Sequence, residues 1–150
     1  MGVHIFPADQ TLINTKITGN NMEYLFGWGY NINIFNSIIS HNKLSENFIK
    51  QYQDSISVYN SIIYNNLSQL NFNNFESVES INNIFTNPKF IEPIDLSDAP
   101  SLEGDYHLKG GSPAINAGDN NYVETSKDLE GYNRILNDTV DIGCYEHEAY

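Results

Sequence analysis

Carboxylates are the residues in the first part of this chain that could cleave a sugar polymer by hydrolysis. Hydrolysis of a glycosidic bond needs two carboxylic acids about 5–9.5 Å apart in a groove. The acidic candidates are Asp9, Glu23, Glu46 and Asp54. They are scattered and share no position at a regular spacing, so a solvated surface explains them better than an active site does. The sequence therefore identifies no catalytic carboxylate pair.

The sequence gives no stronger indication of a lyase reaction or of a metal site than it does of hydrolysis. A polysaccharide lyase needs a basic side chain, and often a cation beside the uronate carboxylate. The basic candidates are Lys16, Lys43 and Lys50, and no acidic cluster accompanies them. The histidines, whose spacing does not match that of zinc ligands, are His4, His41, His107 and His147.

An oxygen-rich loop from Asp119 to Asp128 suits Ca²⁺ by ligand type. It lacks a recognised calcium-loop pattern, so an Asx-rich turn is the stronger interpretation. Cys144 is the single cysteine, which excludes an internal disulfide and fits a small buried residue. We therefore expect no cofactor, with Ca²⁺ as the alternative.

An aromatic row is the best binding candidate. It consists of Tyr24, Phe26, Trp28 and Tyr30. Alternate residues of an extended chain point to the same side, so these rings would share one face, with Gly27 and Gly29 opposite. We expect Tyr24, Trp28 and Tyr30 to contact carbohydrate. The alternative is that the row belongs to ordinary strands and that the glycines serve a corner.

A repeat of 22–24 residues must position these side chains. Its core is clearest in residues 32–42 and 56–66, with weaker copies at 12–20 and 80–87. Self-similarity at such a period is typical of a solenoid. The asparagines that open the four cores are Asn14, Asn36, Asn60 and Asn82. A second asparagine follows six residues later in the first three copies, as Asn20, Asn42 and Asn66.

Each core reads as a strand, an asparagine corner and a second strand. Apolar residues alternate on both sides of the corner, and asparagine adopts the left-handed conformation more easily than most residues. Parallel crossovers are right-handed, so we predict an all-β fold: a right-handed parallel β-helix of about four coils over residues 1–91. The corner asparagines would form a hydrogen-bonded ladder. The column that would point inward is Ile17, Ile39, Ile63 and Phe85.

Residues 92–150 are predicted to cap the last coil within the same structural domain. Residues 91–150 hold thirteen carboxylates and three basic side chains, whereas residues 1–90 hold six and four. Ser112 and Pro113 would open a short helical turn that Gly118 closes in the left-handed conformation. Such a turn would cover the open strand edge.

Arg134 is the only arginine. The carboxylates that could bind its planar fork are Asp128, Glu130, Asp141 and Glu146. We expect these contacts to staple the tail onto the last coil. The functional alternative is a clamp for an anion or a sugar acid.

Several spaced motifs of the C-terminal region occur together. They are Asp105-Tyr106-x-Leu108, Gly111-Ser112-Pro113-Ala114-Ile115, Ala117-Gly118, Asp128-x-x-Gly131-x-x-Arg134 and Asp141-Ile142-Gly143-x-Tyr145-Glu146. In this order they resemble the terminal signature of choice-of-anchor Q domain proteins. The resemblance implies a bacterial right-handed β-helix protein that is secreted or attached to the cell surface.

The net charge of −12 argues against nucleic acid and anionic membranes as partners. No stretch approaches the roughly 18 apolar residues of a membrane span, and residues 1–7 do not resemble a signal peptide. The first predicted coil has no cap. We therefore expect this chain to be the C-terminal part of a longer protein, joined to upstream coils, or to associate with itself at its N-terminal end.

Together these observations predict a non-catalytic extracellular or surface module that is structural or adhesive and contacts carbohydrate. One alternative is a polysaccharide lyase or glycoside hydrolase whose groove lies partly on upstream coils. Another is a trimeric protein that resembles a fibre tip.

Overall fold

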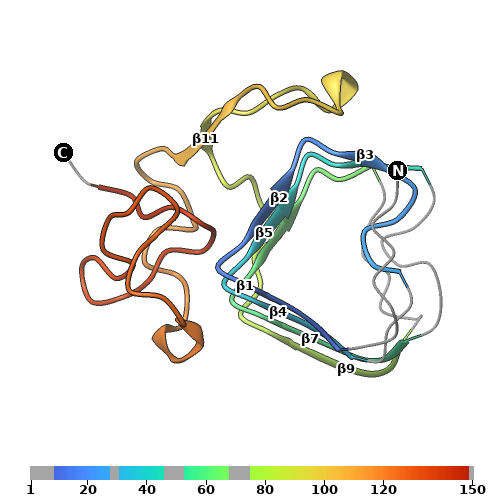
Figure 1. The fold of residues 1–150 in the computed structure, drawn as a ribbon, viewed down its shortest axis with the longest axis horizontal. Helices are drawn as coiled ribbons and strands as arrows, with labels where there is room; N and C mark the ends of the chain where they lie inside the picture. Colours follow the sequence, from blue (N-terminus) through green and yellow to red (C-terminus); the bar gives the residue numbers. More distant parts are fainter. Residues whose placement is uncertain (1–8, 28–30, 46–52, 68–74, 149–150) are drawn as a thin grey trace.

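Parallel strands stacked at the repeat spacing form the largest sheet (Figure 1). The computed structural model describes residues 9–27, 31–45, 53–67 and 75–148. The strands of this sheet, in order, are β1 (Gln10–Ile13), β4 (Asn31–Phe35), β7 (Gln53–Tyr59) and β9 (Phe75–Ile81). Ile32 lies opposite Ile56, and Ile34 opposite Val58. The predicted register between neighbouring copies is therefore confirmed.

Two smaller parallel sheets follow the corner of each repeat. The three-stranded sheet consists of β2 (Lys16–Thr18), β5 (Ile38–Ser40) and β8 (Ile62–Tyr64). The two-stranded sheet consists of β3 (Asn21–Met22) and β6 (Lys43–Leu44). Figure 1 shows the strands of each sheet stacked on one another, with the sheets meeting at corners.

The predicted fold class is right only in being all-β. We expected a right-handed parallel β-helix, but the described residues form four separate small sheets and no closed or solenoid sheet. Three of these sheets are parallel, with four, three and two strands, and the fourth is an antiparallel pair. The reason lies in the repeat itself. Each copy has one long alternating apolar run, whereas after the second asparagine the described residues pair over only two positions, Asn21 with Lys43 and Met22 with Leu44.

The corner asparagines have the predicted left-handed backbone. Their φ angles are 49° at Asn14, 47° at Asn36, 48° at Asn60 and 54° at Asn82. Among the described residues their side chains do not bond to one another in the expected ladder, and those of Asn36 and Asn60 bond to the C-terminal region instead. Asn36 Nδ2 donates to the carbonyl of Asp119, and the Asp119 amide donates to Asn36 Oδ1, both at 2.8 Å.

The side-chain ladder is formed instead by the second asparagine of the first three copies. Asn20 Nδ2 donates to Asn42 Oδ1, and Asn42 Nδ2 donates to Asn66 Oδ1, each at 3.0 Å. Asn42 Nδ2 also donates to the carbonyl of Ile17 at 2.9 Å. Asn42 is fully buried, so these bonds satisfy polar groups that water does not reach.

The core of the stack follows the predicted columns. Ile17 pairs with Ile39, and Ile39 with Ile63. Ile39 is fully buried, but Phe85, which we expected at the end of this column, is 58% exposed. Phe85 belongs to the fourth copy, and none of the described strands lies beyond that copy.

The C-terminal region lies along the side of the stack. It contains the antiparallel pair β10 (Phe90–Glu92) and β11 (Asp105–Leu108), and the 3-10 turns η2 (Leu96–Asp98) and η3 (Asn120–Tyr122). Figure 1 shows its orange and red part beside the corner between the two larger sheets. Its core residues pack with those of the stack in one cluster, Ile38, Ile62, Phe90, Leu108, Ala114 and Ile142. We call residues 90–148 the side brace.

This position differs from the predicted cap over an open strand edge. Ser112 does act as a capping residue, since its Oγ accepts from the Ala114 amide at 3.1 Å. The segment forms turns rather than a helix, and the left-handed residue is Asn116 (φ 53°), not Gly118. Gly118 is required for close approach, because a Cβ there would lie 2.6 Å from Val140 Cγ1. The division of the chain at residue 91 stays a prediction.

Candidate functional site

The predicted aromatic row is only partly within the described residues. Tyr24 is half-buried, and Phe26 is 4% exposed within the core of the stack. Trp28 and Tyr30 lie outside the described residues. The position of Phe26 agrees with an ordinary structural role for that ring, and binding by Tyr24, Trp28 and Tyr30 stays a prediction.

Arg134 is the centre of a buried charged cluster in the side brace. It is 2% exposed, and its Nη1 lies 3.2 Å from Glu146 Oε1. Its Nη2 donates to the carbonyl of Asp141 at 3.2 Å and to that of Gly143. The guanidinium therefore bonds to the segment 141–146 within the side brace itself, and the predicted staple of the tail onto the last coil stays a prediction.

Two of the carboxylates predicted to surround Arg134 accept hydrogen bonds from backbone amides. Asp141 accepts from the amides of Asn116 and His147, each at 2.7 Å. Asp128 accepts from the Glu146 amide at 3.1 Å. The structure thus brings together Asp128, Arg134, Asp141 and Glu146. Glu130 departs from this set and contacts His107 instead.

Burial dominates the electrostatics of this cluster. Burial, reinforced by the charge of Asp141, raises the pKa of Glu146 to about 7, even though Arg134 and backbone amides oppose the shift. Burial also raises the pKa of Asp141 and lowers that of Arg134. A buried carboxyl group with a pKa near 7 makes the cluster sensitive to pH around neutrality.

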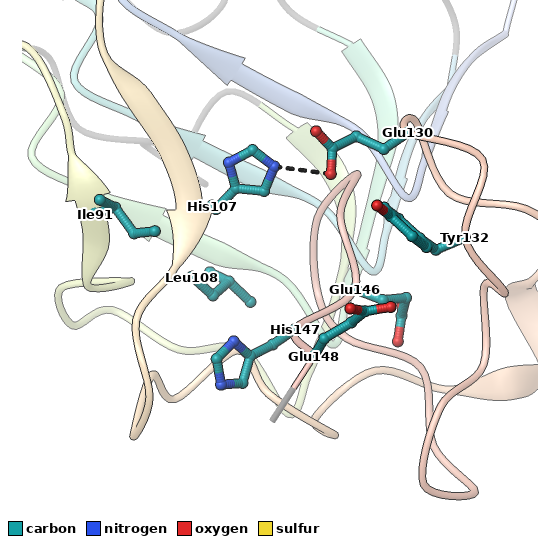
Figure 2. A pocket seen from close by; sticks show the side chains of 8 residues that line it. All are labelled: Ile91, His107, Leu108, Glu130, Tyr132, Glu146, His147 and Glu148. Carbon is teal, nitrogen blue, oxygen red and sulfur yellow. Dashed lines mark ion pairs between the residues drawn. The ribbon is translucent and has the colours of Figure 1, made fainter. Parts of the chain in front are cut away.

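An open pocket of about 320 Å³ lies beside the cluster (Figure 2). Three segments of the side brace supply its walls: the β10–β11 pair, the loop at residues 130–132 and the C-terminal segment 146–148. The lining residues are Ile91, His107, Leu108, Glu130, Tyr132, Glu146, His147 and Glu148. A volume of this size is at the lower end of the range for small-molecule sites.

His107 is held between two carboxylates at the edge of this pocket. Its Nδ1 lies 2.6 Å from Asp105 Oδ1. Its Nε2 lies 3.1 Å from Glu130 Oε2, the contact dashed in Figure 2. The Tyr145 ring stacks on the imidazole with 4.2 Å between centroids. Burial alone would lower the pKa of His107, but the hydrogen bonds and charges of the two carboxylates raise it overall.

This arrangement suits a structural role for His107 better than a role in proton transfer. Because both ring nitrogens of His107 face carboxylates, the protonated form is stabilised and the ring is not a free general base. Among the described residues, no group of three or more His, Cys, Asp or Glu side chains could hold a metal ion. In the proposed calcium loop the Asp119 carboxylate accepts from the Asn121 amide at 2.9 Å, as in an Asx turn. The calcium hypothesis stays a prediction.

Sequence reasoning missed this pocket. Asp105 and His107 stand at alternate positions of an extended segment and therefore share a face. That spacing could have indicated the pair. Nothing in the sequence brings Glu130 or Tyr132 to the same place, because their positions depend on how the brace folds.

Comparison of the chain with family models, with curated proteins and with solved structures finds no match. The resemblance to choice-of-anchor Q domain proteins therefore stays a prediction from the C-terminal motifs. Within the described residues, no helix is both long and apolar enough to cross a membrane.

Proposed function

We propose that the protein is a non-catalytic structural or adhesive module that binds carbohydrate in the pocket beside His107. The observation that carries this proposal is that some residues lining the pocket are paired within the protein whereas others are not. The ionisable groups His107, at the edge of the pocket, and Glu146, which is buried, are engaged by neighbouring side chains of the protein. A ring and acceptor groups remain available at the opening, which suits binding without chemistry.

Tyr132 and Glu148 are the contacts we assign to the sugar. Tyr132 is 49% exposed, and its hydroxyl makes no hydrogen bond to another described residue. Its ring offers a face on which an apolar sugar surface can lie. The half-buried Glu148 carboxylate makes no hydrogen bond or ion pair within the described chain and offers acceptors for hydroxyl or ammonium groups.

The charge of the pocket selects the kind of sugar. Glu130, Glu146 and Glu148 all line it, and the whole chain carries a net charge of −12. Acidic polysaccharides would be repelled, whereas neutral sugars and amino sugars would not. We therefore propose a neutral or amino-sugar polymer as the ligand. A location outside the cell or on a bacterial surface agrees with this ligand and rests on the motif resemblance alone.

Affinity electrophoresis of the intact chain in gels containing chitosan, starch or polygalacturonate tests the proposal. We expect retardation by chitosan or starch and none by polygalacturonate. Tyr132→Ala should weaken binding about ten-fold, as the loss of a central aromatic contact does. Leu129→Ala is the matched control, since Leu129 is exposed on the same loop but does not line the pocket. Equal retardation of parent and Tyr132→Ala, or equal loss in both variants, contradicts the proposal.

A degradative enzyme is the second candidate, and the pKa of Glu146 is the observation in its favour. A carboxyl group with a pKa of about 7 could act as a general acid. However, the Glu146 side chain is 1% exposed and lies against Arg134, so a sugar cannot reach it without rearrangement. Release of reducing ends or unsaturated products from any of the three polymers, abolished by Glu146→Gln, would establish the enzyme instead.

Association at the first strand also belongs to this proposal. β1 is the outermost described strand at its end of the largest sheet, so a further strand of a longer protein or of another copy could pair with it. A trimer in solution would instead support the interpretation as a fibre tip.

A further inference from the structure

The last strand of the largest sheet is open on its outer side. Every residue from 76 to 82 is exposed. Val78 continues the column that contains Ile56, yet Val78 is 41% exposed whereas Ile56 is fully buried. No described strand pairs with the outer edge of β9. Backbone groups on such an edge are a template for another strand.

Apolar side chains gather at the same end of the stack. Within the described repeats, the large apolar residues that are strongly exposed are Leu67, Val78, Ile81 and Phe85. Three of them belong to the fourth copy, and Leu67 follows β8 in the third. The side brace lies beside the stack and leaves this end uncovered (Figure 1). An exposed apolar surface continuous with an open sheet edge indicates an interface.

The sequence of β9 is complementary to itself, which identifies the occupant of this edge. We propose that a second copy of the chain pairs with β9 in antiparallel orientation about Val78. In this register Val78 faces the partner's Val78, and Glu76 faces the partner's Ser80. Ser77 likewise faces the partner's Glu79. Each carboxylate therefore meets a hydroxyl group, and no two carboxylates are directly opposite.

Two of the neighbouring registers are worse because they bring carboxylates together. Centring the pair on Glu79 places that carboxylate opposite its own copy. Centring it between Ser77 and Val78 places Glu76 opposite the partner's Glu79. Like charges directly opposite destabilise a strand pair. The register about Val78 avoids both contacts, and its two-fold symmetry closes the assembly at two copies, the commonest form of oligomer.

The resulting dimer joins two four-stranded sheets into one continuous sheet. It covers Val78 and satisfies the open edge of β9. It does not involve the pocket beside His107, so it is independent of the carbohydrate proposal. The net charge of −12 on each copy opposes association, so dimerisation should strengthen as salt screens that repulsion.

Sedimentation equilibrium of the intact chain over a range of concentrations, at low and moderate salt, tests this inference. We expect a monomer–dimer equilibrium that shifts toward dimer with salt. Ser80→Lys places an ammonium group opposite the partner's Glu76 and should tighten the dimer. Ser80→Glu places a carboxylate there and should weaken it. Each dissociation constant should move by about two- to thirty-fold, since the contact occurs twice.

The matched pair at residue 80 also controls for damage to the monomer. Both variants lose the same 3.0 Å bond from Asn83 Nδ2 to Ser80 Oγ, so a difference between them reports the partner's charge. If either variant unfolds, Ser77→Lys and Ser77→Glu test the same register opposite the partner's Glu79. The inference is overturned by a monomer at all concentrations, by a trimer, or by equal shifts in the lysine and glutamate variants.

Discussion

Replacing Glu146 with glutamine should flatten the pH dependence of stability. Glu146 lies in the side brace with a side chain that is 1% exposed, and it contacts Arg134 and the amide of Asp141. Burial and the charge of Asp141 raise the pKa of Glu146 from 4.5 to about 7. Glutamine keeps the size of the protonated side chain but cannot lose a proton. The variant therefore isolates the cost of ionising this group.

The magnitude follows from the pKa difference between the folded and unfolded chains. The folded protein binds the proton more tightly, so this contribution to stability is fully present below pH 4.5 and is lost as the pH rises through 7. A shift from 4.5 to about 7 corresponds to about 3 kcal/mol at about 1.4 kcal/mol per pKa unit. His107, whose pKa is also raised, adds a loss of the same sign above pH 6.5, in parent and variant alike.

Urea denaturation at several pH values between 4.5 and 8 measures this effect. The free energy of unfolding of the parent should fall by about 3 kcal/mol more across this range than that of Glu146→Gln. Taking the difference between the two profiles removes the contribution of His107 to the pH dependence, and also any constant cost of the substitution. Parallel profiles, or a parent that gains stability relative to the variant as the pH rises, would refute the reasoning.

Two further substitutions test the packing. Gly118→Ala should destabilise the protein by about 1–3 kcal/mol in urea denaturation, because the new Cβ would lie 2.6 Å from Val140 Cγ1; Gly110→Ala, which meets nothing within 4 Å, should be nearly neutral, and similar losses in both would contradict this account. Asn42→Ala should cost about 2–3 kcal/mol, because it breaks a buried ladder at its centre. Asn33→Ala, which removes one exposed 3.4 Å bond, is the comparison, and a larger loss there would show that the ladder is not the stabilising element.

The repeat could be predicted from sequence because its signals are local. Period-two alternation and a left-handed asparagine at each corner specify which residues stack, and Ile39 lies between Ile17 and Ile63 as expected. The prediction that the corner asparagines form the ladder is wrong because of a contact between residues far apart in the sequence. The amide of Asn36 is used by Asp119, 83 residues away in the chain.

The closed solenoid and the cap could not be predicted in the same way. How far a repeat continues as a sheet depends on whether its return arms pair, and the described residues after the second asparagine pair over only two positions. The side brace was placed over the strand edge because its motifs indicate local turns but not the surface on which they dock. The contact of Arg134 with Glu146 could be predicted, since a lone arginine among carboxylates has few other partners. The pocket at Tyr132 depends on the docked brace.

The side brace also determines how the protein comes apart. In an array where each repeat touches only its neighbours, the end repeats can melt separately from the middle. Here the Ser101 amide donates to the carbonyl of Gly19 in the first copy at 3.0 Å, and the Gly143 amide donates to that of Asn36 in the second at 2.8 Å. Asn60 of the third copy donates to the Ala117 carbonyl at 3.4 Å. The side brace thus ties three successive copies together, so we expect the described copies to unfold together rather than one by one.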